Sequence, residues 1–67
     1  MNIYQFLKEW KGRNITIVTK RNEGIYKGIL KEVEGSAHGG IGNILLQNSE
    51  DWVLIRGSCV FYFQLEE

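Results

Sequence analysis

Five short segments rich in β-branched, aliphatic or aromatic residues follow one another along this chain, and no proline interrupts them. Each segment is bounded by glycine or by short polar residues, which are the residue types that favour turns. Many short strands separated by turn signals predict an all-β fold that closes into a small barrel. The five strands are expected at about residues 14–20, 25–34, 44–46, 52–55 and 59–64.

A short amphipathic helix is expected before the strands, at about residues 2–10. Its apolar residues recur at the spacing i, i+3, i+4 and i+7, which places them on one helical face. Asn2 is the expected N-cap of this helix, and Gly12 is its expected stop. A helix of about nine residues is too short to stand alone, so its apolar face must pack on the strands. That face consists of Ile3, Phe6, Leu7 and Trp10.

The second strand carries a glycine at its centre, Gly28. Glycine weakens a strand interior and therefore indicates a bulge or a sharp bend. Such a bend would let one long strand serve both halves of a barrel. One face of this strand is expected to carry Ile25, Lys27, Ile29, Lys31 and Val33. Residues 35–42, which hold four of the eight glycines, are expected to form a flexible loop.

The chain of 67 residues has room for a single domain, and its one cysteine cannot form an internal disulfide. A domain of this size buries little surface, so a second copy is a natural source of stability. The last strand is apolar on both faces, with Phe61 and Phe63 on one side and Tyr62 on the other. Two apolar faces on a terminal strand favour pairing with another copy, while cover by the N-terminal helix is the alternative.

The charge balance and residue inventory exclude several function classes. Eight basic and eight acidic residues give a net charge of zero, so binding of nucleic acid by bulk charge alone is excluded, although a local basic patch is not. One His and one Cys argue against a zinc site, and the acidic residues are scattered, so neither a cofactor nor an enzyme is expected. The apolar runs are too short for a membrane span and no signal peptide is expected, which leaves the cytoplasm as the expected compartment.

Three motifs together resemble the signatures of the Sm/LSm (Sm-like) family of RNA-binding proteins. The segment from Val53 to Val60, with Ile-Arg-Gly at its centre, resembles the second signature. Gly28-Ile29-Leu30 and Asn43 followed by an apolar strand resemble parts of the first signature. The order of a helix and five strands also agrees, so the resemblance covers residues 1–67 as one domain. The motifs are closer to the archaeal and eukaryotic branch than to the bacterial Hfq branch.

The resemblance implies a strongly bent, five-stranded SH3-like barrel with a short N-terminal helix. It also implies a homo-oligomeric ring, in which the fourth strand of one copy pairs with the fifth strand of the next. In this family the ring binds single-stranded, usually U-rich RNA at its inner rim and acts in RNA processing or as an RNA chaperone. The expected partners are therefore other copies of the chain and single-stranded RNA.

The resemblance also implies which residues contact RNA. Asn43 matches the family Asn, whose amide suits the uracil edge; the alternative is that it satisfies backbone groups of its own loop. Arg56 matches the family Arg, which can stack on a base; the alternative is a solvated turn residue. Gly57 gives the turn backbone freedom. Ile41 stands where the family stacks a side chain on the base, and His38 lies in a longer loop from which it could cover a base.

Other interpretations remain open at the level of sequence. The family usually places an Asp four residues before the Asn, whereas the nearest acid upstream of Asn43 is Glu34. Together with Ile41 and the zero net charge, this departure is compatible with an Sm-like ring that serves as a structural or protein-interaction assembly with weak or no RNA binding. A monomeric SH3-like adaptor is a further alternative.

Overall fold

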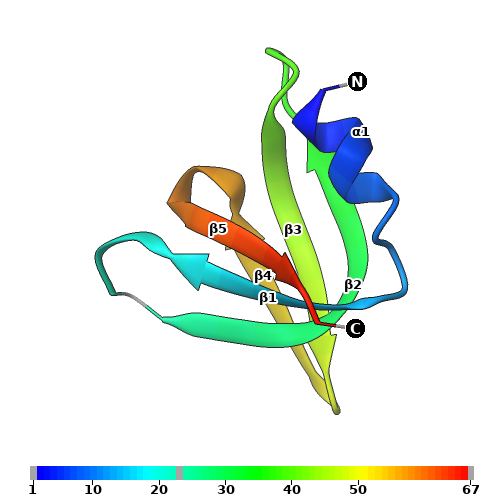
Figure 1. Ribbon diagram of the computed structural model, residues 1–67, viewed down its shortest axis with the longest axis vertical. Helices are drawn as coiled ribbons and strands as arrows, with labels where there is room; N and C mark the ends of the chain where they lie inside the picture. Colours follow the sequence, from blue (N-terminus) through cyan, green and yellow to red (C-terminus); the bar gives the residue numbers. More distant parts are fainter. Residues whose placement is uncertain (1, 23, 67) are drawn as a thin grey trace.

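The chain forms one antiparallel β-sheet preceded by a short helix, as seen in a computed structural model that describes residues 2–22 and 24–66 (Figure 1). This architecture confirms the mostly β fold and the N-terminal helix that the sequence predicts. The helix and strands are α1 (Ile3–Lys8), β1 (Asn14–Thr19), β2 (Ile25–Gly35), β3 (Ile41–Asn48), β4 (Asp51–Arg56) and β5 (Val60–Leu65). Two 3₁₀ turns connect strands: η1 (Lys20–Asn22) follows β1, and η2 (Gly57–Cys59) joins β4 to β5.

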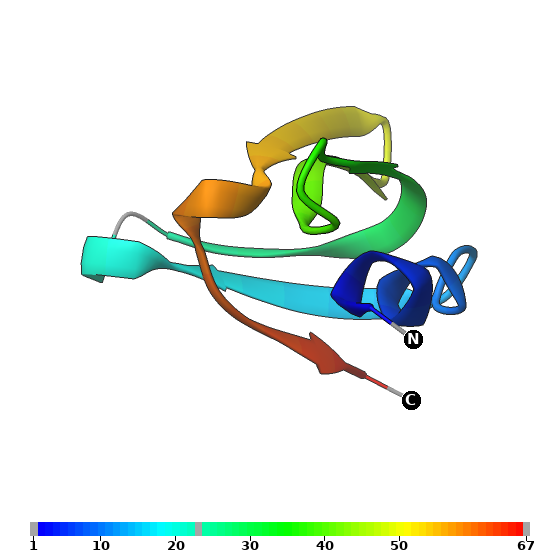
Figure 2. The ribbon, with the colours of Figure 1, turned by 90° about the horizontal axis from the view of Figure 1, so that it is seen from above.

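The five strands lie in the order β4-β3-β2-β1-β5, and every neighbouring pair is antiparallel. Seen from above in Figure 2, the sheet runs from β4 at the top of the view to β5 at the bottom. Among the described residues, β4 and β5 share no ladder, so they form the two edges of the sheet. The sheet is therefore open, and the closed barrel predicted from the sequence is not formed by its hydrogen bonds.

The N-terminal cap of α1 follows the sequence prediction. The Asn2 side chain accepts a hydrogen bond from the backbone N–H of Gln5 (2.8 Å), and the Gln5 side chain accepts one from the backbone N–H of Asn2 (3.3 Å). This reciprocal arrangement is a capping box, which satisfies two backbone donors at the start of the helix. Asn2 is thus the N-cap, as predicted.

The rest of α1 departs from the prediction. The helix ends at Lys8, before Gly12, whose positive φ of 88° belongs to the following turn. The backbone N–H of Gly12 donates to the carbonyl of Leu30 (2.8 Å), so this turn is fixed against β2. Of the predicted apolar face only Leu7 is fully buried, while Ile3 and Phe6 remain 52% and 47% exposed. The helix is so short that the sheet covers only part of the helix's apolar face.

The long strand β2 is strongly curved, as Figure 1 shows, and at Gly28 its backbone runs close to that of β3. A Cβ atom at residue 28 would lie 2.7 Å from the backbone carbonyl oxygen of Gln47, which is far too close for any side chain. Gly28 therefore permits the close approach of two backbones, which is another known role of a glycine inside a strand besides a bulge or a bend. The bulge itself lies further along the strand.

A β-bulge between Leu30 and Glu32 changes which residues of β2 face the core. The predicted alternation from Ile25 to Val33 is wrong, because the extra residue shifts the phase of the pleat. Leu30 and Val33 are buried, whereas Ile25 is 65% exposed. The bulge increases the local twist and so contributes to the bend of the strand.

The glycine-rich segment is shorter as a loop than the sequence predicts. Strand β2 continues to Gly35 and β3 begins at Ile41, so only residues 36–40 form the connection. A backbone hydrogen bond from Ser36 to the carbonyl of Gly40 (3.0 Å) closes this hairpin. The remaining strand boundaries agree with the prediction to within one residue, except that β3 ends at Asn48, two residues later than predicted.

The hydrophobic core lies on the concave side of the curved sheet and beneath α1. Cross-strand neighbours from β1, β2, β3 and β4 supply nearly all of it, so the core depends on strands that are distant in sequence. Its buried members are Leu7, Ile15, Ile17, Leu30, Val33, Ile44, Leu46 and Ile55. Within residues 2–22 and 24–66, α1 is too short to cross a lipid bilayer, and no helix meets the length and hydropathy that a span requires.

Replacing Gly28 by Ala is expected to lower the free energy of unfolding by about 1–3 kcal/mol, because the new methyl group must displace the backbone of β3. Urea unfolding followed by tryptophan fluorescence measures the change. Gly42→Ala is the matched control, since a Cβ there has only ordinary contacts at 3.5 Å. Equal free energies of unfolding for the two variants would show that the backbone of β3 can move aside at no cost in stability.

Candidate nucleic-acid interface

Asn43 and Arg56 lie directly opposite each other in the sheet. Asn43 is near the start of β3 and Arg56 is the last residue of β4, and the two are register partners. Their neighbours Ile44 and Ile55 point into the core, so the alternation of the strands turns Asn43 and Arg56 to the outer face. Two residues that the sequence analysis selected separately are therefore adjacent side chains on one surface.

The Asn43 side chain is held in place by a carboxylate. Its Nδ2 donates a hydrogen bond of 2.7 Å to Oε1 of Glu34 on β2. A carboxylate accepts and a carboxamide nitrogen donates, so this bond fixes which end of the amide faces Glu34. Among the described residues, the Oδ1 acceptor and the second N–H of Asn43 have no hydrogen-bond partner, so both can meet a ligand.

A shallow pocket of about 230 Å³ opens beside Asn43 on the same face. Leu45 and Leu54 are cross-strand partners, and they give the pocket an apolar floor. Leu54 is 68% exposed, so much of this floor faces solvent. The pocket is lined by Glu32, Glu34, Asn43, Leu45 and Leu54.

The charges around the pocket are of both signs. Glu32 forms an exposed ion pair with Lys11 (3.0 Å), which balances its charge locally. Glu34 is engaged by the Asn43 amide. The Arg56 side chain is exposed, and the structure gives it no hydrogen-bond or ion-pair partner among the described residues. Arg56 is thus a cation opposite Asn43 in the sheet, although it does not line this pocket and instead lines a separate hollow with Val53 and Cys59.

Gly57 packs against the start of β3. A Cβ at this position would lie 2.8 Å from the carbonyl oxygen of Gly42 and closer still to that of Ile41. No side chain fits in that space, so a glycine is required where η2 leaves β4. The close packing of η2 on β3 holds the end of β4, and with it Arg56, beside Asn43.

Ile41 faces away from the pocket. Between Val33 and Gly35 the register shifts, so that more residues of β3 than of β2 span this interval. The irregularity turns Ile41 inward, where it packs against the core cluster, while Asn43 stays on the outer face. Ile41 is therefore not among the pocket-lining residues, and the structure does not bring it together with Asn43.

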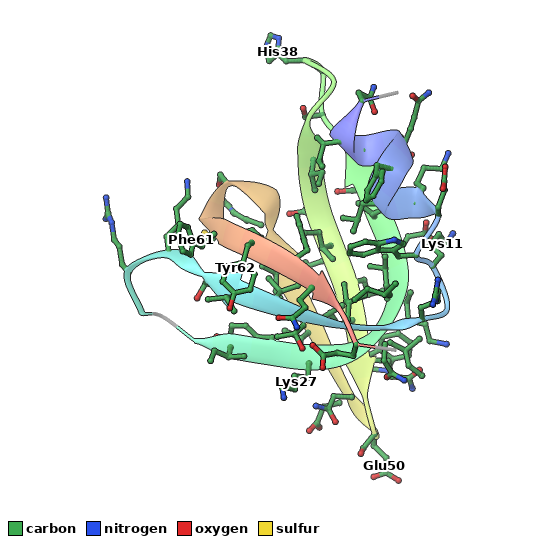
Figure 3. All side chains as sticks on the ribbon, viewed as in Figure 1. Lys11, Lys27, His38, Glu50, Phe61 and Tyr62 are labelled. Atoms are coloured by element: carbon green, nitrogen blue, oxygen red, sulfur yellow. The ribbon has the colours of Figure 1, made fainter. Side chains whose placement is uncertain are left out.

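His38 is also separated from Asn43 and Arg56. It is exposed at the tip of the β2–β3 hairpin, and Figure 3 shows it pointing away from the body of the sheet. The strands beneath it extend further than predicted, which carries the histidine outward. Of the five predicted contact residues, the structure thus groups Asn43, Arg56 and Gly57 and leaves Ile41 and His38 apart.

Four pocket residues were missed by the sequence analysis as candidate site residues: Glu32, Glu34, Leu45 and Leu54. Leu45 and Leu54 lie two positions from Asn43 and Arg56, so strand alternation alone carries the signal that would have found them. The contact of Glu34 depends on the hairpin register and its irregularity, which local sequence does not specify. In the structure it supplies the acidic neighbour that the sequence placed too far upstream of Asn43.

Comparison of the chain with protein-family models, with curated proteins and with solved structures finds no match. The functional assignment therefore depends on the residues themselves. In the described part of the chain, no three His, Cys, Asp or Glu side chains gather in a way that could hold a metal ion. What the site offers chemically is hydrogen bonding from a carboxamide, a positive charge and an apolar surface.

Replacing Gly57 by Ala is expected to destabilise the protein by about 1–3 kcal/mol, since the methyl group overlaps the backbone of β3. The same change should shift the NMR signals of the Asn43 side-chain amide, because η2 must move away from β3. Ser58→Ala, an exposed change in the same 3₁₀ turn, is the control and should alter neither property. An unchanged Asn43 signal in Gly57→Ala would show that η2 does not position the site.

Proposed function

We propose that this chain is an Sm-like protein that binds single-stranded, U-rich RNA and assembles into a homo-oligomeric ring. The observation that carries the proposal is the cross-strand pairing of Asn43 with Arg56 beside a pocket with an apolar floor. These residues match the two signature positions that contact RNA in the Sm family, and they come from strands that only the fold brings together. The curved sheet with its N-terminal helix also agrees with the Sm barrel, which this proposal takes as the fold type.

A uracil base suits the groups that the pocket presents. Uracil offers an N–H donor beside a carbonyl acceptor on its Watson–Crick edge, and a carboxamide offers the complementary acceptor and donor. Glu34 engages one N–H of Asn43, so Oδ1 is oriented to accept from the base and the remaining N–H is oriented to donate. This orientation is set before RNA arrives, which lowers the cost of ordering the side chain on binding.

Arg56 and the two leucines of the pocket floor supply the other favourable contacts with RNA. A guanidinium stacks on a base and adds positive charge near the phosphates. Leu45 and Leu54 offer an apolar surface to the second face of the base. In a ring, the Arg56 side chains of all copies surround one opening, and their fields add, so a chain of zero net charge still creates a positive rim.

The two open edges of the sheet support assembly. Both β4 and β5 have one edge without a partner strand, and β4 also carries the exposed side chain of Trp52 (58%). Pairing β4 of one copy with β5 of the next satisfies the backbone groups of both edges and covers Trp52. Because the two edges differ, the contact is heterologous and repeats from copy to copy, as in a ring.

A second candidate function is an Sm-like ring that binds protein and not RNA. The observation that favours it is the pair of carboxylates, Glu32 and Glu34, in the wall of the pocket, since they repel phosphate. The two functions differ in salt-sensitive affinity for RNA, which the first requires and the second lacks.

Replacing Asn43 and Arg56 together by Ala is expected to lower the affinity for a short oligo-U by about tenfold or more, as the loss of base contacts worth roughly 1–3 kcal/mol each predicts. Fluorescence anisotropy with oligo-U and with a matched oligo-A measures the effect, with mass by light scattering on the same samples. The preference for oligo-U over oligo-A should disappear along with the affinity.

The control for this experiment is the double variant Asn14→Ala and Lys31→Ala. It removes one carboxamide and one cation from exposed positions outside the pocket. Its affinity for oligo-U should match that of the parent protein. Equal affinity of the Asn43/Arg56 variant and the parent would overturn the pocket assignment, and the absence of RNA binding by the parent would favour the protein-binding function.

Replacing Leu54 by Lys is expected to dissociate the ring into monomers, because a lysine on an edge strand opposes pairing with another strand. Light scattering at micromolar concentration measures the mass, and circular dichroism checks that the sheet is retained. Ile3→Lys is the control, since Ile3 is also about half exposed (52%) but lies on α1, away from both edges. If both variants keep the mass of the parent assembly, the β4 edge does not take part in the contact.

A further inference from the structure

A second concave surface lies at the end of the β1–β5 ribbon, and it has no residue in common with the Asn43 pocket. It is a groove of about 520 Å³, larger than the pocket beside Asn43. Three elements form it: the end of β1, the turn η1 and the start of β5. The groove is lined by Val18, Thr19, Lys20, Arg21, Phe61 and Tyr62.

A bulge at the start of β5 exposes the two aromatic side chains of this groove. Val18 pairs with Tyr62 and Thr19 pairs with Val60, so Phe61 is an extra residue without a partner in β1. Phe61 is 70% exposed and Tyr62 is 46% exposed. Their ring centroids lie 5.7 Å apart at an interplanar angle of 58°, so the rings do not stack on each other. Figure 3 shows both side chains on the β5 side of the molecule.

Two cations border the aromatic pair. The structure gives neither Lys20 nor Arg21 an ion-pair or hydrogen-bond partner among the described residues. Arg21 has a left-handed backbone conformation (φ 60°), which a residue other than glycine rarely adopts. This conformation reverses the chain at η1 and brings both residues to the groove. The described lining contains no carboxylate, in contrast to the pocket beside Asn43.

We propose that this groove is a second binding site for single-stranded nucleic acid, in which a base stacks on Phe61 or Tyr62 and the flanking phosphates meet Lys20 and Arg21. Exposed aromatic faces next to cations are the combination that binds single strands with little regard to sequence, since every base has a π-face. A duplex does not present its base faces, so it is excluded as the ligand. A concave shape accepts a planar base, whereas insertion into a lipid surface requires protruding side chains.

This inference does not rest on the proposed function, because it uses different residues and predicts a different specificity. The Asn43 pocket reads the edge of a base and should prefer uracil. The groove offers stacking and charge, so it should bind oligo-U and oligo-A alike. A strand held at both places would gain affinity from two linked contacts.

The test of the charges is the double variant Lys20→Ala and Arg21→Ala, titrated with oligo-U and oligo-A at several salt concentrations. Affinity for both oligonucleotides should fall about fivefold or more, and the slope of log K against log salt should decrease by about 1.4, since each phosphate contact on a single strand contributes roughly 0.7. The matched control is Lys27→Ala with Lys31→Ala, which removes two exposed cations of β2 outside the groove and should leave the slope unchanged. Figure 3 shows Lys27 well away from Phe61 and Tyr62.

The test of the aromatic faces is Phe61→Leu with Tyr62→Leu, which keeps apolar bulk and removes the π-systems. Affinity for both oligonucleotides should fall, and the mass by light scattering should not change. In the parent protein, 4-thiouridine placed in the oligonucleotide should crosslink to Phe61 or Tyr62 under ultraviolet light, as mapped by mass spectrometry.

Several results would overturn the groove assignment. One is an unchanged salt slope in the Lys20/Arg21 variant. Another is a Phe61/Tyr62 variant that loses its assembly but keeps its RNA affinity, which would make the groove a contact between subunits. Binding to vesicles rich in anionic lipid that is lost in the Lys20/Arg21 variant, with RNA affinity intact, would assign the surface to membranes. If Asn43→Ala with Arg56→Ala has no effect while the groove variants do, the groove stands and the uracil pocket fails.

Discussion

The close contact between β2 and β3 at Gly28 is the constraint on which the rest of the structure depends. A single sheet of five strands encloses a core only if it curls, and the long strand β2 curves along its length while Gly28 leaves room for the carbonyl of Gln47, where a Cβ would not fit. The bulge that follows turns Leu30 and Val33 inward. Together these features put β3 and β4 over the core, and so they set the face on which Asn43 and Arg56 meet.

The sequence predicted the positions of the helix and strands well, but it predicted less well which side chains of each strand face the core. Runs of β-branched residues located the strands, and Asn2 with Gln5 located the helix start, because these signals are local. The directions of the side chains of β2 and of Ile41 were not predictable, since each depends on an irregularity in the pairing of β2 with β3 whose position the sequence of either strand alone does not specify. The open edges were foreseen only in part: the apolar last strand indicated an exposed edge, but closure of the sheet depends on all five strands.

The candidate site shows the same division between local and long-range information. Asn43, Arg56 and Gly57 were found from short motifs, and the fold brings them together. Glu34 was missed, although its bond to Asn43 is the contact that orients the amide. Residues that bind are recognisable from their chemistry, whereas residues that position them are recognisable only once the register is known. His38 marks the opposite case, a residue with suitable chemistry that the extended hairpin carries away.

The two unlike edges of the sheet have a consequence for how this chain exists in solution. In the proposed ring, each copy contributes one unpaired strand at each edge of its sheet, so every added copy leaves two edges open until the last copy meets the first. Closure of the ring pairs the last two open edges. An incomplete ring therefore has fewer contacts per copy than a closed ring. The apparent stability of the folded chain then depends on its concentration, because folding and association draw on the same contacts. Dilution would act on such a protein as a mild denaturant does on a monomer.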